Sequence, residues 1–268
     1  MTIPNSSKNR RILLAYSGGM DSTYLLWKLL RDGHEVVDTV TFLTEGYDAS
    51  LLRDDIDRDY YYDIKMNARN YAEVVPALLY WFADHGMPIK RHYIINSDQP
   101  KPWEAPTSNW IRSLGPQLME SYDVFMTGRT LDKFGFDETK RLEQVKEACL
   151  MWNDTPCEFP LIDQRLTRVH GLAELPKDLI DLTLSCEWPV RRIHPLEGRL
   201  RNCGVCYKCK ENSLLARAVE LDCMDIAKVS EHYLSSIKGR APTSRGQSTP
   251  ADRKVVVFPD LSGFKRRP

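Results

Sequence analysis

The sequence predicts an α/β protein in which helices flank a parallel sheet. Its 268 residues are 42% apolar, enough to bury the core of one large domain. Short apolar runs alternate with amphipathic stretches, as in a parallel sheet with crossover helices. We expect this α/β domain over residues 1–170, a small helical region over 171–238, and a flexible tail over 239–268, which is rich in Ser, Thr, Pro, Gly and Arg.

The first half of the chain supplies three predicted strands. The mostly apolar run 11–16 predicts a strand, and leucines at helical spacing predict a helix at 22–31. The runs 35–43 and 90–96 predict the second and third strands. Between these two, the amphipathic stretch 59–85 predicts a long helix.

The second half continues the alternation. Four elements are expected there: a helix at 109–121, a strand at 123–126, a helix at 137–152 and a helix at 176–184. The strand ends at Thr127 and Gly128. Because open parallel sheets bind ligands beyond the carboxyl ends of their strands, these two residues are candidates for a binding site.

Charge and hydropathy narrow the class of partner. Lys and Arg total 37, and so do Asp and Glu, so no overall field favours nucleic acid or an anionic membrane. Residues 1–10 are polar, unlike a signal peptide, and no stretch approaches the roughly 18 apolar residues of a membrane span. We therefore expect a cytoplasmic protein without a membrane partner. Nucleic acid is not expected as a partner. The basic tail is the only segment where we would expect a patch that binds it.

The segment between the first strand and the first helix, Ser17–Ser22, predicts an anion-binding loop. Gly18 and Gly19 allow a tight turn that directs backbone N–H groups to one point at a helix N-terminus. Ser17 and Ser22 add hydroxyl donors. Asp21 has two open roles, either accepting backbone N–H bonds within the loop or helping to place Mg²⁺. The alternative is a plain turn with a helix cap.

This loop resembles the Ser-Gly-Gly-x-Asp-Ser signature of the pyrophosphatase-loop (PP-loop) ATPases, whose sheet is Rossmann-like, of the adenine nucleotide α-hydrolase type. The Walker A pattern and the three-glycine dinucleotide fingerprint are both missing from the sequence. The resemblance implies that the loop grips the pyrophosphate of ATP with Mg²⁺ present, and that Ser17, Asp21 and Ser22 are catalytic. The expected ATP-binding set is Tyr16, Ser17, Gly18, Gly19, Met20, Asp21, Ser22, Thr127 and Gly128.

Four of the seven cysteines predict a metal site. Cys203, Cys206 and Cys209 follow a Cys-x2-Cys-x2-Cys pattern, and Cys186 precedes them, so four thiolates can close a structural Zn²⁺ site. An iron–sulfur cluster uses similar spacing and is the main alternative. The other alternative is that the four thiols bind no metal.

The loop and the cysteine pattern together resemble the 7-cyano-7-deazaguanine (preQ0) synthase family over residues 12–217. That resemblance implies that ATP adenylates the carboxylate of 7-carboxy-7-deazaguanine, that ammonia displaces AMP to give the amide, and that a second ATP activates the amide as the nitrile forms. It also suggests a homodimer.

The chain departs from this family on the substrate side, at residues 45–47, at residues 107–109 and at Gln164. Three alternatives therefore stay open. The first is a tRNA-modifying enzyme of the same ATP class. The second is a nucleotide-binding protein without turnover. The third is an enzyme that attaches a deazaguanine-like group to a macromolecule.

Overall fold

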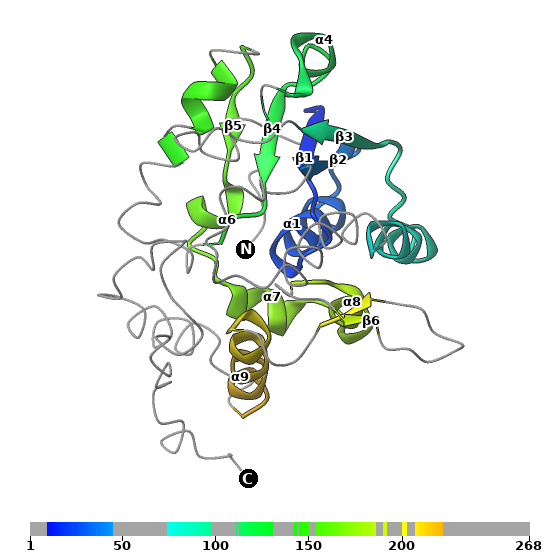
Figure 1. The fold of residues 1–268 in the computed structure, drawn as a ribbon, viewed down its shortest axis with the longest axis vertical. Helices are drawn as coiled ribbons and strands as arrows, with labels where there is room; N and C mark the ends of the chain where they lie inside the picture. The colour runs from blue at the N-terminus through cyan, green and yellow to red at the C-terminus, as the bar shows by residue number, and fades with distance from the viewer. Residues whose placement is uncertain are drawn as a thin grey trace, which may run out of the picture.

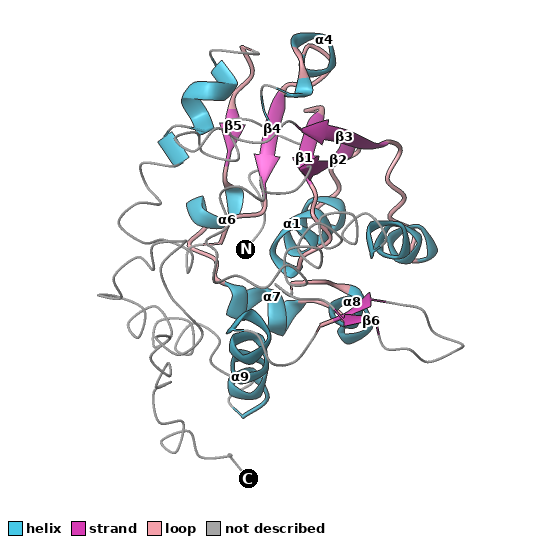
Figure 2. Ribbon diagram, in the orientation of Figure 1, coloured by secondary structure: helices cyan, strands magenta, loops and turns pink. Residues whose placement is uncertain are grey.

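A computed structural model of the chain describes residues 10–44, 74–97, 111, 113–130, 142–143, 145–150, 154–185, 190–191, 200–202 and 207–221. One sheet lies at the upper part of the view in Figure 1, with helix α1 against it and the helices of the last third of the described chain below. Figure 2 shows the same arrangement by secondary structure. The predicted α/β class is confirmed.

The sheet has five strands in the order β3-β2-β1-β4-β5, and every neighbouring pair is parallel. Its strands are β1 Ile12–Ala15, β2 Val37–Thr44, β3 His92–Ser97, β4 Val124–Thr127 and β5 Cys157–Glu158. The first four lie within two residues of the predicted ranges. The predicted parallel sheet is therefore confirmed, and its order is that of a doubly wound fold.

The strand order reverses between β1 and β4. After β1 the chain moves outward through β2 and β3, then returns to place β4 on the other side of β1, with Ala15 opposite Thr127. In an open parallel sheet this reversal leaves a crevice beyond the carboxyl ends of the two strands. The loop that follows β1 and the residues that follow β4 therefore lie at the same end of the sheet.

Two apolar clusters cover the two faces of the sheet. Successive side chains of a strand point to opposite faces, so Ile12 and Leu14 join one cluster and Leu13 joins the other. Helix α1 (Met20–Arg31) and the helical residues 74–84 pack on the first face. The second face is covered by buried residues from three later segments, among them Ile111, Met119, Leu142, Val145 and Cys149.

The predicted helix 109–121 is wrong as a single helix in its described part. Residues 111, 113 and 114 are helical, the helix stops at Gly115, and a new short helix, α4, spans Pro116–Met119. Gly115 has a φ of +70°, which glycine adopts without strain. Pro116 lacks an N–H and disfavours helical geometry at the residue before it, so the chain kinks here.

Helix α8 (Lys177–Leu182) lies within the predicted range 176–184, and α9 (Tyr207–Leu221) lies in the region expected to be helical, 171–238. The division of the chain into domains stays a prediction. Helix α1 begins two residues before the predicted start. Sequence reasoning missed α7 (Arg168–Glu174) and the antiparallel pair β6 (Val190–Arg191) and β7 (Leu200–Arg201), and assigned no type to α6 (Pro160–Asp163). The predicted tail, 239–268, lies outside the described residues. Among the described helices, none is long and apolar enough to cross a membrane.

Candidate functional site

The Ser17–Ser22 loop joins β1 to α1 at the carboxyl end of the central strand. Gly18 has a φ of +71°, so the turn needs a residue without a side chain. A Cβ there would also stand 3.2 Å from Val75 Cγ2. Gly19 is the N-cap of α1 and has no side-chain cap. The predicted glycine turn and helix start are therefore both present.

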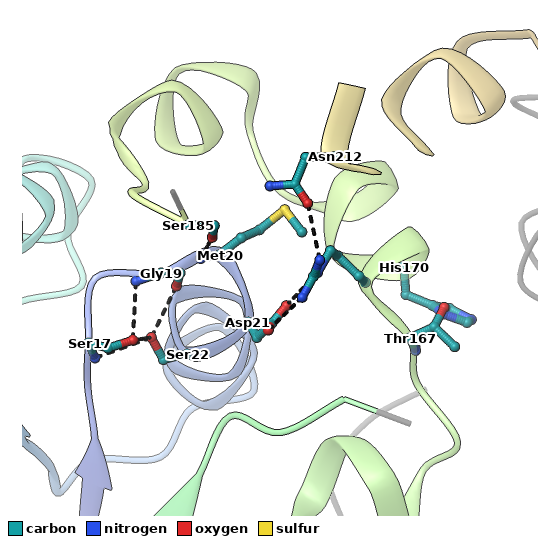
Figure 3. A network of polar contacts seen from close by, with 10 residues as sticks. Ser17, Gly19, Met20, Asp21, Ser22, Thr167, His170, Ser185 and Asn212 are labelled. Carbon is teal, nitrogen blue, oxygen red and sulfur yellow. Dashed lines mark hydrogen bonds and ion pairs between the residues drawn. The ribbon is translucent and has the colours of Figure 1, made fainter. Parts of the chain in front are cut away.

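The hydroxyls of Ser17 and Ser22 meet across this turn. Their Oγ atoms lie 3.3 Å apart, and Ser22 Oγ donates to the Gly19 carbonyl at 3.0 Å. The Gly19 N–H donates to Ser17 Oγ at 3.4 Å. Figure 3 shows the three residues together at the start of α1. Ser17 is an exposed residue and Ser22 a buried one, so a ligand would reach the pair from the Ser17 side.

Tyr16, just before the loop, and Met20, the first residue of α1, are both buried. Tyr16 Oη lies 3.2 Å from Thr23 Oγ1, and burial raises the pKa of Tyr16 above its ordinary value. The Met20 N–H donates to Ser185 Oγ at 3.0 Å. Both side chains lie in the core, so their part in the site is to hold the loop backbone in place.

Thr127 and Gly128 follow β4 and lie against the start of α1. A Cβ on Gly128 would stand 2.5 Å from Ser22 Cα, closer than any tolerated contact. Thr127 is buried, and its Oγ1 has no hydrogen-bond partner among the described residues. A buried hydroxyl without a partner is costly, and a bound ligand would satisfy it. The structure thus brings together the two chain segments that were predicted from separate parts of the sequence.

Asp21 faces a different side of the helix start. Its carboxylate accepts from Arg168 Nε at 3.3 Å and from Arg168 Nη2 at 3.4 Å, while Arg168 Nη1 donates to Asn212 Oδ1 at 3.3 Å. In Figure 3, Asp21 points toward α7, away from Ser17 and Ser22. The ion pair with Arg168 is a third role for Asp21, which was not predicted from the sequence. The two roles predicted for Asp21 stay predictions.

The predicted metal site falls mostly outside the described residues. Cys209 is buried in α9, whereas Cys186, Cys203 and Cys206 are not described. Within the described part of the chain, no three His, Cys, Asp or Glu residues are grouped as metal ligands. The four-cysteine Zn²⁺ site stays a prediction.

Sequence reasoning missed Arg168 and Ser185, which contact Asp21 and Met20, and Asn212, which contacts Arg168. They come from α7, from the segment after α8 and from α9, so only the tertiary fold makes these contacts. One local signal was present for Arg168. Thr167 and His170 form a capping box, which marks a helix start and fixes the backbone of the residue after the cap.

No protein-family model matches the sequence, and no curated protein matches it. Among solved structures, the chain is similar to a universal stress protein family member from Burkholderia pseudomallei, with 14% identity, 59% of this chain and 99% of that one covered, and a TM-score of 0.33. It is similar to the U34-tRNA thiolase NcsA from Methanococcus maripaludis with its [4Fe-4S] cluster, with 11% identity, 95% and 82% covered, and a TM-score of 0.35.

A universal stress protein in complex with cAMP is a further similar structure, with 13% identity, 56% of this chain and 96% of that one covered, and a TM-score of 0.30. Likenesses at this level carry no inference about substrate or reaction. The α/β class of the chain follows from its own strand order.

Proposed function

We propose that this chain is an ATP-using enzyme of the PP-loop type, which activates an acid by adenylation and releases pyrophosphate. The observation that carries the proposal is the packing of Gly128 against Ser22, which joins the loop after β1 to the end of β4 at the reversal of strand order. Ligands of doubly wound sheets bind at this position. A plain turn with a helix cap explains neither the space denied to a Cβ at Gly128 nor a buried Thr127 hydroxyl without a hydrogen-bond partner in the described part of the chain.

The residues present fit the phosphates of ATP. Gly18 and Gly19 have no side chains that could block a phosphate, and α1, a helix of 12 residues, directs its N-terminal dipole at this point. Ser17 offers an exposed hydroxyl, and Ser22 lies 3.3 Å from it. These groups would hold pyrophosphate oxygens and stabilise the charge that develops on them as the bond to AMP breaks. Mg²⁺ would accompany ATP and supply further positive charge there.

The candidate acid is 7-carboxy-7-deazaguanine, on the strength of the sequence resemblance. ATP would adenylate its carboxylate with release of pyrophosphate, and ammonia would then displace AMP to give the amide. A second ATP would activate the amide oxygen, which leaves with AMP as the nitrile forms. Adenylation makes each oxygen a good leaving group, so no side-chain nucleophile is needed. The proposed structural cofactor is Zn²⁺ on the four cysteines, of which Cys209 is described.

The test is mass spectrometry of products after the protein is incubated with 7-carboxy-7-deazaguanine, ammonium, ATP and Mg²⁺, with AMP followed in parallel. Nitrile together with AMP supports the whole proposal. AMP without nitrile supports the ATP chemistry and rejects this acid, and the assay is then repeated with tRNA as acceptor. ATP binding without AMP supports a nucleotide-binding protein without turnover. Absence of ATP binding rejects the proposal.

A further inference from the structure

Arg168 connects the start of α1 to α9. It is the first residue of α7, and each of its three guanidinium nitrogens has a named partner. Nε and Nη2 donate to the two carboxylate oxygens of Asp21, and Nη1 donates to Asn212 Oδ1. Two donors facing two carboxylate oxygens form a bidentate pair, which fixes orientation as well as distance. The guanidinium is therefore held from two helices at once.

Both charges of this pair are buried. Arg168 is 5% exposed and Asp21 is 9% exposed. Burying a charge is expensive unless a partner compensates it, and removing one partner leaves the other charge uncompensated. The pair spans 147 positions of sequence. It therefore makes the geometry at the start of α1 dependent on where α7 lies.

The position of α7 is itself fixed on both sides. Thr167 caps the helix, with its N–H and its hydroxyl each 3.1 Å from His170 Nδ1. Gly171 brings the helix against Tyr24 of α1, where a Cβ would stand 3.4 Å from the ring. Helix α7 also packs against α9, and Figure 1 shows α7 between α1 above and α9 below. A shift of α9 would therefore reach Arg168 through packing as well as through Asn212.

Asp21 is the second residue of α1, in the first turn of the helix whose N-terminus would receive phosphate. A carboxylate here repels a polyanion through a partly buried, low-dielectric environment. The guanidinium compensates that charge and holds the carboxylate on the α7 side, away from Ser17 and Ser22 (Figure 3). Both effects favour a loop that accepts ATP.

We propose that Arg168 is a positioning residue for ATP binding, and that Asn212 orients it, so that the placement of α9 controls the Ser17–Ser22 loop. This inference rests on the proposed function and adds a part that the loop motif does not contain. Lysine cannot replace arginine, because one ammonium group cannot face both carboxylate oxygens and the Asn212 amide in this fork geometry.

The test is the dissociation constant of ATP with Mg²⁺, measured by titration calorimetry on the full chain, so no acceptor substrate is needed. Four proteins form a cycle: wild type, Arg168→Lys, Asn212→Ala and the double variant. Arg168→Lys is expected to weaken ATP binding about tenfold, and Asn212→Ala several-fold. The double variant is expected to bind like Arg168→Lys alone, because Asn212 acts through Arg168.

Matched controls come from exposed positions of α9. Arg217→Lys repeats the arginine change and Ser213→Ala the truncation, both on exposed residues, and both are expected to leave ATP binding unchanged. Thermal unfolding of every variant separates binding from stability. A general structural role predicts additive losses of affinity that follow the melting temperature, and that result overturns the inference.

The two proposals fail in different ways. Wild-type protein that binds no ATP overturns the proposed function and this inference with it. Wild-type protein that binds ATP while Arg168→Lys binds equally well overturns the inference alone. If Arg168→Lys does not fold, Asn212→Ala alone tests the inference. An unchanged affinity of Asn212→Ala for ATP would show that α9 does not act on the loop through Asn212.

Discussion

Gly128 lies so close to Ser22 that a Cβ on the glycine would stand 2.5 Å from Ser22 Cα and 2.8 Å from Ser22 N. Both obstacles are backbone atoms, which cannot rotate away as a side chain can. The end of β4 and the first turn of α1 therefore approach each other closely at main-chain atoms. This contact depends on glycine.

The first prediction follows directly. Gly128→Ala is expected to displace the start of α1, to lower the free energy of unfolding by about 1–3 kcal/mol, as overpacking does, and to abolish ATP binding. Urea denaturation and calorimetry measure the two effects. Gly33→Ala is the control: its φ of +84° strains an alanine but a Cβ there would meet no atom within 4 Å, so it should lower stability without changing ATP affinity. Full ATP affinity in Gly128→Ala would refute the site.

Ser17 is the exposed serine of the loop. Ser17→Ala is expected to reduce pyrophosphate release about 10²–10³-fold, the usual cost of removing one donor from a developing negative charge. The melting temperature is expected to change little, because an exposed hydroxyl contributes little to stability. A coupled pyrophosphate assay gives the rate, and Ser213→Ala on α9 serves as the exposed serine control. Unchanged turnover would exclude Ser17 from phosphate contact.

A third prediction concerns acid stability. Trp81 Nε1 donates to Asp178 Oδ2 at 2.6 Å and lowers the pKa of Asp178. Because the folded pKa lies below the unfolded value of about 3.9, this stabilisation is present above about pH 4 and is lost as pH falls through the folded pKa.

The free energy of unfolding of wild type should therefore exceed that of Asp178→Asn near neutral pH, and the difference should shrink with acidification below about pH 4. Urea denaturation at a series of pH values measures it. Asp84→Asn, an exposed position on the helix that carries Trp81, is the control. A difference that stays constant down to the most acid pH would contradict the assignment.

The fourth prediction tests the metal. Purified protein is expected to carry one Zn²⁺ per chain by elemental analysis, and Cys209→Ser should lose zinc and stability together, since structural zinc contributes to folding. Cys157→Ala is the control, a buried cysteine of the second apolar cluster. A brown protein that contains iron and sulfide would show that the cysteines bind an iron–sulfur cluster and not zinc.

The sequence predicts the structural features whose signals lie in neighbouring residues, and it does not predict contacts between distant residues. The glycine turn at Gly18 and the start of α1 are encoded in six consecutive residues, and both are present. Strands β1 to β4 were predicted from short apolar or β-rich runs. By contrast, Arg168 reaches Asp21 across 147 positions, and no local pattern in the sequence joins the two. The break at Gly115 was visible as Gly115-Pro116, a dipeptide that marks turns, but the prediction of a single helix over 109–121 did not use it.

The pairing of β1 with β4 has a consequence for how this protein comes into being. Arg11 N donates to Asp123 Oδ2 at 2.7 Å, joining positions 112 residues apart where the two strands start. During synthesis, more than a hundred residues must leave the ribosome after β1 before β4, its second neighbour in the sheet, can pair with it. Contacts of such long range form slowly. The proposed ATP site, which needs Gly128, is therefore expected to form late in folding, and a nascent chain should not bind ATP before β4 has paired with β1.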